Sequence, residues 1–386
     1  MKHQSGKKPR VLHVLKSLPL GGIETWLMHV LRGDRQSLVQ HELLLMVEEP
    51  SAYEREARQL GIVIHKLPKD GSWVRWFSSL FRFLKRNGPF DAVHSHVAYA
   101  VSSPIIAIAA LAGVPARIAH QHEARSLGTD FRTVQQRAIR RAAMALYGWT
   151  ATKRIGITEA TIEEIAGKAW RRKANCSILI YGFDYSNFDG AAERAQVLRR
   201  SLQLPADAHI VGHVGRFAPV KNHAFLLRTF AKIASADPRA QLVMVGEGRL
   251  EPEMKRLARD LDIHDRVRFA GTSEDIAAYM SLFDLFLFPS YSEGLGIVCV
   301  EAQAAGTRVL TSDTVPIEAD VVPGGVEFLP LARGEDAWAD RAIELLALPR
   351  PDPKSWRKTV EQSAFGLDRC ISELHGIYRE QLELSE

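Results

Sequence analysis

The chain has 386 residues, of which 46% are hydrophobic and 25% charged, which excludes a disordered protein and allows two hydrophobic cores of ordinary size. Its three cysteines, Cys176, Cys299 and Cys370, are far apart and form no C-x-x-C pair, so we expect reduced thiols and a cytoplasmic protein rather than a disulfide framework or a zinc site. The sequence contains no run of about 18 apolar residues, so we expect no transmembrane helix. The segment after the basic N-terminus is too short and too polar for a secretory signal, so none is expected.

The net charge of +5 is distributed unevenly along the chain. Residues 1–185 carry 27 Lys and Arg against 15 Asp and Glu, whereas residues 186–386 carry 23 against 30. A basic half indicates an anionic partner, such as lipid headgroups, lipid phosphates or nucleic acid, and ordinary solvated charge is the alternative. Because the basic residues are dispersed without an RNA- or DNA-binding motif, we do not expect nucleic acid.

The first half alternates between strand and helix patterns. A buried strand at 11–18, a loop at 18–24 and a helix at 25–33 that ends at Gly33 predict one βα unit. Further strands are expected at 41–47, 63–67, 91–96 and 117–122, with helices at 72–86 and 100–112.

The segment 71–87 predicts an amphipathic helix with an aromatic stripe. Basic residues lie off this stripe, a combination that suits a membrane interface. Packing on the domain's own sheet is the alternative, and Phe81 and Phe83, which lie off the stripe, favour the membrane. The stripe consists of Trp73, Trp76, Phe77, Leu80 and Leu84.

The second half repeats the alternation. Strands are expected at 210–216, 241–246, 266–271, 284–290 and 308–313, with helices at 223–235, 250–260, 274–283 and 296–305. Regular alternation predicts parallel sheets that helices cover on both faces, so each half is expected to be a doubly wound α/β domain, with the linker near 182–208.

Polar residues follow the predicted strands, where open α/β sheets bind ligands. The loop after 210–216 holds Arg216 and Lys221, and two cations on one short loop suit a diphosphate; a solvated helix start is the alternative. Pro219 stiffens this loop, and we expect Asn222 to cap the next helix. Glycines allow backbone to approach a ligand at 246–248 and at 293–296, where helix N–H groups also favour an anion.

Glu301 lies on a helix whose other residues are nearly all apolar or small. A buried carboxylate requires a partner, which is either a cation such as Arg308 or a ligand hydroxyl. A phosphate at the helix start would leave a ribose within reach of Glu301. Gly21 and Gly22 follow the first strand in the same way, but their spacing is not that of a dinucleotide-binding loop. The only D-x-D, at 260–262, is expected to be a solvated helix end, so we expect no metal site.

Seven short motifs lie along the chain: G-G-I-E-T (21–25), H-Q-H-E (120–123), Y-G-F-D (181–184), G-R-F-A-P-V-K-N (215–222), V-G-E-G (245–248), F-P-S-Y-S-E-G-L-G-I-V-C-V-E-A-Q-A-A-G (288–306) and S-D-T-V-P-I-E (312–318). Together, these residues resemble glycosyltransferase family 4, whose members are retaining enzymes. The likeness covers nearly the whole chain and is greatest for bacterial exopolysaccharide and capsule enzymes. It implies a GT-B fold, in which two Rossmann-like domains face each other across a cleft and a C-terminal helix crosses back to the first. We therefore expect an acceptor-binding domain at 1–185, a nucleotide-sugar-binding domain at 186–365 and a returning helix at 366–386.

The resemblance also assigns roles to residues of the donor site. Arg216 and Lys221 match a cationic pair on the donor diphosphate, while Glu293 and Glu301 match the two acids of an E-x7-E motif. Glu293 would lie beside the donor sugar, and Glu301 would bind a ribose hydroxyl. The same comparison adds Gly246, and the backbone N–H groups of Gly294 and Leu295, to the donor site.

In the first domain, Gly21 and Gly22 resemble a loop that closes over phosphate or acceptor. Either His122 or His120 matches a histidine that contacts the sugar, because strand alternation leaves both open. The expected catalytic residues are therefore Glu293, His122, Arg216 and Lys221. The chain departs from the family near the linker, where Tyr181 and Gly182 replace the usual Asn-Gly.

The implied reaction is transfer of a sugar, with retention, from a nucleotide-sugar donor, with uracil as the expected base, to a saccharide or polyprenyl-diphosphate-linked acceptor. No metal or other cofactor is expected. Front-face transfer would let the donor phosphate help to deprotonate the acceptor. Peripheral contact with the anionic inner face of the membrane is expected if the helix at 71–87 faces lipid. The alternatives are a hydrolysing sugar-nucleotide 2-epimerase of similar fold and a non-catalytic subunit of a polysaccharide assembly complex.

Overall fold

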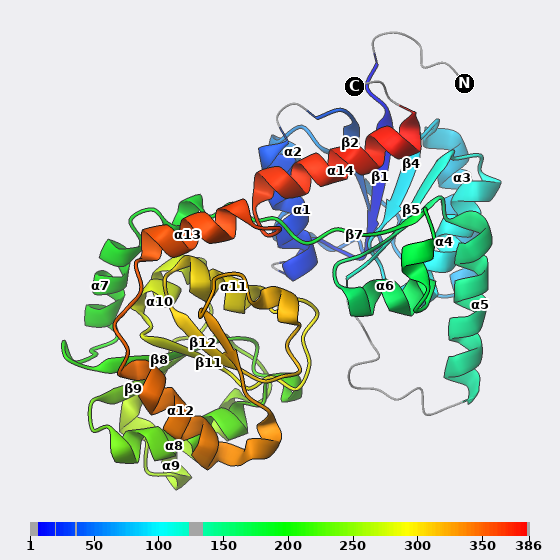
Figure 1. The fold of residues 1–386 in the computed structure, drawn as a ribbon. Coiled ribbons are helices and arrows are strands. Elements are labelled where there is room, and N and C mark those ends of the chain that lie inside the picture. The colour runs from blue at the N-terminus through cyan, green and yellow to red at the C-terminus, as the bar shows by residue number, and fades with distance from the viewer. Residues whose placement is uncertain (1–6, 20, 35–36, 123–133, 384–386) are drawn as a thin grey trace. The chain divides into compact units, whose positions relative to one another are not determined.

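A computed structural model describes residues 7–19, 21–34, 37–122 and 134–383. The chain divides into two compact units (Figure 1). Unit 1 contains the residues up to Phe183 and those from Ala364 onward, and unit 2 runs from Asp184 to Ser363. These limits lie within two residues of the sequence-based boundaries at 185 and 365. The returning C-terminal segment is helix α14 (Leu367–Leu382), which packs on α1 of unit 1.

Unit 1 is built around a parallel sheet of seven strands in the order β3-β2-β1-β4-β5-β6-β7. Helices α1 and α14 lie on one face of the sheet, and α3, α4 and α5 lie on the other (Figure 1). The strands are β1 (Arg10–Leu15), β2 (Gln40–Leu45), β3 (Val63–Lys66), β4 (Ala92–Ser95), β5 (Ala116–Gln121), β6 (Lys153–Gly156) and β7 (Cys176–Ile178). The helices are α1 (Gly22–Gly33), α2 (Glu54–Gln59), α3 (Trp73–Asn87), α4 (Tyr99–Leu111), α5 (Val134–Thr150) and α6 (Glu159–Ala166), with a 3₁₀ turn η2 (Trp170–Arg172).

Unit 2 repeats this plan with six parallel strands in the order β10-β9-β8-β11-β12-β13. The strands are β8 (His209–Val214), β9 (Ala240–Val245), β10 (Val267–Phe269), β11 (Leu285–Phe288), β12 (Arg308–Thr311) and β13 (Val326–Phe328). The helices are α7 (Ala191–Ser201), α8 (His223–Ala236), α9 (Glu251–Asp260), α10 (Ile276–Leu282), α11 (Ile297–Ala304), α12 (Gly334–Leu346) and α13 (Pro353–Gln362). Its 3₁₀ turns are η3 (Ser186–Phe188), η4 (Pro219–Lys221), η5 (His264–Arg266), η6 (Ile317–Ala319) and η7 (Leu331–Arg333).

Apolar side chains on alternate strand positions build each core. In unit 1, Leu12 and Val14 pack with Trp76 and Leu80 of α3, so most of the predicted stripe faces the sheet, whereas Trp73 is 40% exposed. In unit 2, Leu242 and Met244 pack with side chains of α8, α9 and α12. Both sheets are doubly wound, as the alternation of strands and helices predicts.

Three local predictions were wrong. Helix α1 begins at Gly22, inside the predicted loop, because Gly21 is its extended N-cap and Thr25 N–H already donates to Gly21 O at 2.8 Å. The predicted linker at 182–208 includes the crossing between Phe183 and Asp184 but is too long, because it also contains α7, which packs on α10 of unit 2. Asn222 does not cap α8 with its side chain; it takes a left-handed conformation with φ 54°, which asparagine tolerates better than most residues.

The D-x-D sequence lies at the end of α9, where Asp260 and Asp262 are both exposed, as expected of a solvated helix end. Among the described residues, no helix combines the length and apolar character needed to cross a membrane.

Candidate functional site

The order of strands reverses between β8 and β11, which are hydrogen-bonded neighbours in unit 2. Loops that leave such a pair run to opposite sides of the sheet and leave a crevice beyond the carboxyl ends of the strands. Residues 215–222 follow β8 and residues 289–296 follow β11. The predicted diphosphate loop and the predicted acidic loop therefore meet at the switch point of the sheet.

Hydrogen bonds join these two loops directly. Tyr291 N–H donates to Val220 O at 2.8 Å, and Ser290 Oγ lies 2.9 Å from the same oxygen. Thr314 Oγ1 after β12 donates to Ser290 O at 2.8 Å. These hydrogen bonds therefore hold the loops at the base of the crevice in place before any ligand binds.

Lys221 and Glu293 form the central ion pair of this site. Lys221 Nζ lies 2.7 Å from Glu293 Oε1, with both side chains more than four-fifths buried. Ser290 Oγ donates a second hydrogen bond to Glu293 Oε1, and Lys221 Nζ lies 4.7 Å from the centre of the Phe288 ring. The structure thus brings together two residues that were assigned separately to diphosphate and sugar.

Arg216 is exposed on the same loop as Lys221. It makes no hydrogen bond or ion pair with any described side chain, so its charge is available to an anion. An exposed guanidinium with five N–H donors can bind two phosphate oxygens at once.

Glu301 is half-buried on α11 and has no cationic partner among the described residues. Arg308, the alternative partner considered from sequence, instead donates to Pro349 O at 2.8 Å. Burial raises the pKa of Glu301 to about 7, and no described side chain hydrogen-bonds to its carboxylate. A desolvated, unpaired carboxylate is the arrangement that a ligand hydroxyl satisfies.

The N-terminus of α11 points backbone N–H groups toward the same region. Gly296 is the N-cap, with φ 72° that favours glycine. Among the described residues, no acceptor is found for the N–H groups of Gly294 and Leu295, although the Leu295 side chain is only 2% exposed. The buried Leu295 side chain therefore fixes the position of these two N–H groups at the start of α11, where an anion could accept hydrogen bonds from them.

Gly246 and Gly248 have a structural role that needs no ligand. A Cβ on Gly246 would lie 2.3 Å from Gly215 O, and one on Gly248 would lie 2.6 Å from Phe217 O. These glycines let the loop after β9 lie against the loop that carries Arg216. Gly246 thus shapes the donor loop by packing, and ligand contact is not needed to explain it.

Unit 1 has its own pocket, with a volume of about 480 Å³, beyond the carboxyl ends of β1, β2, β4 and β5. Most of the wall is apolar and includes Met46 and Trp73. Gly21 and Gly22 lie at the start of α1, next to two residues of this wall. The polar side chains of the wall are Lys16, Glu24, Lys69, His96, Gln121 and His122.

The sequence left open whether His120 or His122 faces the pocket, and the structure places the two side chains differently. His122 lines the pocket together with His96, whereas His120 is not part of the wall and packs edge-on against Trp26 at 5.3 Å. Both ring nitrogens of His122 already have partners, Tyr181 OH and His96 Nδ1. Glu123, the last residue of the predicted H-Q-H-E motif, lies outside the described residues.

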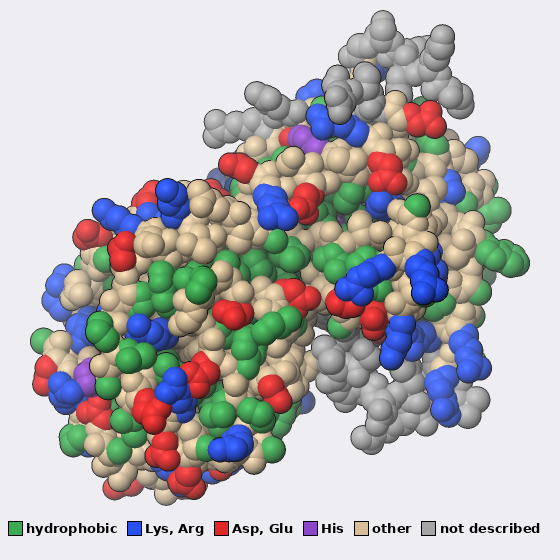
Figure 2. Space-filling view, in the orientation of Figure 1, with side chains coloured by type: hydrophobic (Ala, Val, Ile, Leu, Met, Phe, Trp, Pro, Cys, Tyr) green, Lys and Arg blue, Asp and Glu red, His purple; other side chains and the backbone are tan. Residues whose placement is uncertain are grey.

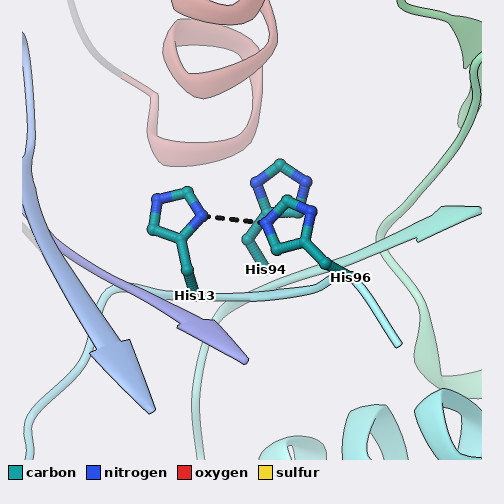
Figure 3. A group of neighbouring side chains, drawn as sticks. All are labelled: His13, His94 and His96. Carbon is teal, nitrogen blue, oxygen red and sulfur yellow. Dashed lines mark hydrogen bonds between the residues drawn. The ribbon is translucent and has the colours of Figure 1, made fainter. Parts of the chain in front are cut away.

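Two groups of buried histidines bring ring nitrogens within 4.8 Å of one another: His13 with His94 and His96, and His96 with His120 and His122. Figure 3 shows the first group, with its rings close together beside β1 and β4. His13 Nδ1 lies 2.9 Å from His96 Nε2, which is a direct hydrogen bond. Two nitrogens on one tetrahedral ion lie about 3.3 Å apart at bond lengths near 2.0 Å, so the observed spacing favours hydrogen bonding over a shared ion.

Sequence reasoning missed Lys16 and Lys69 of the pocket, and His13, His41 and Asp34 beside the histidine group. Lys16 directly follows β1, so its position after a strand was a usable signal. The other positions required the register between strands, which a single sequence does not show.

A protein-family model described as "Glycosyl transferases group 1" matches residues 195–363 of this chain. The match covers most of unit 2 and its site. Over 380 residues, the chain is 33% identical to EpsF of Bacillus subtilis (strain 168), which is named as a glycosyltransferase; the match spans 97% of each chain.

Solved structures of the same fold extend this likeness. Anabaena Alr3699/HepE in complex with UDP superposes with a TM-score of 0.77 at 18% identity, covering 96% of this chain and 100% of that one. The glycosyltransferase WaaG, involved in lipopolysaccharide biosynthesis, gives a TM-score of 0.72 at 18% identity over 95% and 99%. The fold is thus GT-B, with two Rossmann-like units, and the chain belongs to the glycosyl transferases of group 1.

Proposed function

We propose that this glycosyltransferase moves a sugar, with retention of configuration, from a UDP-linked donor to a saccharide or polyprenyl-diphosphate-linked acceptor in surface polysaccharide synthesis, at the cytoplasmic side of the membrane. The observation that carries the proposal is the paired Lys221 and Glu293 at the switch point of unit 2, with unpaired Glu301 on the following helix. HepE, which shares the fold, has been solved with UDP and with UDP-glucose.

The donor diphosphate would lie between the loop after β8 and the start of α11. Arg216 offers an unpaired charge, and Lys221 offers a charge that Glu293 now balances. A diphosphate would compete for Lys221 and free Glu293 to accept hydrogen bonds from sugar hydroxyls. Gly294 and Leu295 would donate backbone N–H groups to the same anion.

Glu301 would accept hydrogen bonds from the ribose. Its carboxylate is desolvated, so a bond from a ribose hydroxyl is worth more there than in water. The ionised form accepts these bonds best, so nucleotide binding would lower the pKa of Glu301 from its raised value.

The chemical step breaks the bond between the sugar C1 and the phosphate oxygen and forms a bond from C1 to the acceptor oxygen on the same face. The acceptor proton passes to a phosphate oxygen of the departing nucleoside diphosphate. Arg216 and Lys221 would stabilise the charge that develops on this leaving group, which is the usual source of a large rate effect. No step in this scheme uses a metal ion or other cofactor.

The pocket of unit 1 is proposed to hold the acceptor. Its apolar wall with Trp73 would contact an apolar or ring portion, and Lys16 and Lys69 would contact phosphate. An acceptor that combines a saccharide with a lipid diphosphate offers both kinds of surface.

Membrane contact is a further part of the proposal. On α3, Val74 is 74% exposed and Phe81 is 38% exposed. Figure 2 shows Lys and Arg side chains gathered over α5 and α6 on the face drawn. Exposed basic residues of that region are Arg137, Arg141, Lys168, Arg171 and Arg172. Apolar and basic side chains of this kind support binding to an anionic bilayer.

The test is a screen of UDP- and GDP-sugars with candidate acceptors, using wild type, Glu301→Gln and the matched control Glu253→Gln on the exposed face of α9. We expect wild type and Glu253→Gln to release UDP only when an acceptor is present, and Glu301→Gln to release none. A free 2-epimer would instead identify a hydrolysing epimerase, and no binding of any sugar nucleotide would favour a non-catalytic subunit. An inverted anomeric product would contradict retention.

A further inference from the structure

A continuous chain of hydrogen-bonded side chains runs behind the pocket of unit 1. It starts at Tyr181 OH, passes through four imidazole rings and ends at a carboxylate. The links after Tyr181 and His122 are His122 Nε2 to His96 Nδ1 at 3.0 Å, His96 Nε2 to His13 Nδ1 at 2.9 Å, His13 Nε2 to His41 Nδ1 at 2.8 Å, and His41 Nε2 to Asp34 Oδ2 at 3.3 Å. Figure 3 shows the link between His13 and His96.

The carboxylate end of the chain sets its direction. Burial alone would raise the pKa of Asp34, but hydrogen bonds from His41 and His375 lower it to about 2. An ionised carboxylate only accepts hydrogen bonds, so His41 must donate its Nε2–H. Ser37 Oγ lies 3.1 Å from His41 Nε2 and donates its own proton to Val39 O. Toward His41 it is therefore a second acceptor.

Each further link then follows from the one before. A neutral imidazole has one N–H and one lone pair, so a ring that donates from Nε2 accepts at Nδ1. With His41 neutral, as the proposal below requires, its Nδ1 accepts from His13; His13 then accepts from His96, and His96 accepts from His122. His122 finally accepts from the hydroxyl of Tyr181, which completes a chain with a single direction.

Burial keeps the three inner rings neutral. His13, His96 and His122 are at most 5% exposed. Desolvation lowers the pKa of His96 to about 3, and burial together with neighbouring histidines places the pKa of His13 and of His122 well below its ordinary value. The rings therefore differ only in tautomer, which the chain selects.

We propose that Asp34 is a positioning residue of the unit 1 pocket: through His41, His13 and His96 its carboxylate holds His122 and His96 as Nε2–H tautomers with fixed ring orientation. Asp34 is not part of the pocket wall, whereas His96 and His122 are. The consequence for acceptor binding rests on the proposed function, but the tautomers themselves do not.

The chain of hydrogen bonds also explains Tyr181, the residue at which the sequence departs from the family pattern. Tyr181 stacks on Trp26, with ring centres 5.0 Å apart and planes at 14°, and its hydroxyl supplies the hydrogen bond that His122 Nδ1 requires. Without that donor, the last acceptor of the chain would be buried and unsatisfied, which costs free energy.

The primary test is ¹⁵N-histidine NMR of the intact wild-type protein at pH 7.5. His13, His41, His96 and His122 are expected as neutral Nε2–H tautomers that EDTA does not change, while exposed His264 exchanges freely with solvent. An Nδ1–H tautomer or an imidazolium at any of the four positions would overturn the chain. Stoichiometric bound metal, with signals that move when EDTA removes it, would overturn it equally.

A second test removes both acceptors of His41 Nε2–H with Asp34→Leu combined with Ser37→Ala. His41 is then expected to turn to the Nδ1–H form and to carry His13, His96 and His122 with it. In turnover, KM for the acceptor should rise at least fivefold while KM for the donor is unchanged, because the proposed donor site lies in unit 2.

His375→Phe is the matched control, since it removes the second hydrogen-bond donor to Asp34 and leaves the His41 contact in place. Unchanged tautomers of His96 and His122 in the double variant would contradict the proposal. Failure of the glycosyl transfer assay alone would bear on the proposed function and leave the spectroscopic result standing.

Discussion

Lys221 and Glu293 are 72 residues apart in sequence, yet their charged atoms lie 2.7 Å apart in unit 2. One follows β8 and the other follows β11, the two strands at which the order of the sheet reverses. The pair therefore fixes the geometry of both loops before a donor binds, and it keeps each charge compensated while the site is empty.

Substitution of Lys221 by methionine is expected to lower kcat/KM for the donor by about 100-fold, because a cation beside the leaving diphosphate is lost. Steady-state kinetics with the best donor from the screen measures this loss. Lys358→Met, at an exposed position of α13, is the control and should retain activity.

The same pair makes a prediction about stability. Lys221→Met leaves Glu293 partly buried without its cation and should destabilise the protein by about 1 kcal/mol. Adding Glu293→Gln removes the uncompensated charge, so urea unfolding of the double variant should show less destabilisation than the sum of the single changes. Strict additivity would mean that the two residues do not interact in solution.

Affinity for UDP should depend on pH through Glu301. Its raised pKa, about 7, means that the carboxylate is largely protonated below that pH and accepts ribose hydrogen bonds poorly. We expect UDP to bind more tightly as the pH rises from 6 to 8, in calorimetry at constant ionic strength. Glu301→Gln should lose this dependence, and an identical pH profile in the variant would contradict the assignment.

The sign of the effect on folding is opposite. In the unfolded chain the pKa of Glu301 returns to its ordinary value of 4.5, so between that value and about 7 the folded state binds more protons. Glu301 therefore makes the ligand-free protein less stable as the pH rises through this window. Glu301→Gln should flatten this part of the pH dependence of urea unfolding.

Gly182→Ala should destabilise unit 1. A Cβ there would lie 2.4 Å from Cys370 Cβ and 2.6 Å from Gly366 O, so α14 would have to shift. We expect a loss of about 1–3 kcal/mol in urea unfolding, as in other overpacked sites. Gly376→Ala, with no neighbour within 4 Å on α14, is the control and should be neutral or stabilising.

Contact with an anionic bilayer should depend on the exposed side of α3. Val74→Glu with Phe81→Glu is expected to reduce co-sedimentation with vesicles that contain phosphatidylglycerol at least threefold, because apolar insertion is replaced by charge repulsion. Val197→Glu, at a 56% exposed position of α7, should have no effect. Equal binding by all three proteins would remove α3 from the proposed membrane surface.

Strands that are continuous apolar runs could be predicted within a few residues, because both faces of a parallel sheet are buried. L-F-L-F of β11 is such a run. K-R-I-G of β6 and C-S-I of β7 were missed, since they are short and polar for buried strands. Helix α7 looked like a linker because Ala191 and Ala195 are its only fully buried side chains.

The donor residues could be placed on loops from sequence, but their mutual contacts could not. The pairing of Lys221 with Glu293 requires β8 and β11 to be neighbours, which follows from the winding of the sheet and not from either motif. Likewise, His41 and His13 meet because β1 and β2 run side by side with His13 opposite Leu43, two residues from His41 and on the same face of the sheet. A single sequence gives residue types and local periodicity, whereas register arises only on folding.

The two crossings between the units adjoin each other in unit 1, where Phe183 N–H donates to Phe365 O at 2.9 Å and Phe183 bridges to Gly366. Unit 2 is thus a domain inserted between two neighbouring points of a host fold. A gene that joins Phe183 to Ala364 through a short glycine linker should encode the host alone, and the excised insert should carry the proposed nucleotide site as a separate polypeptide.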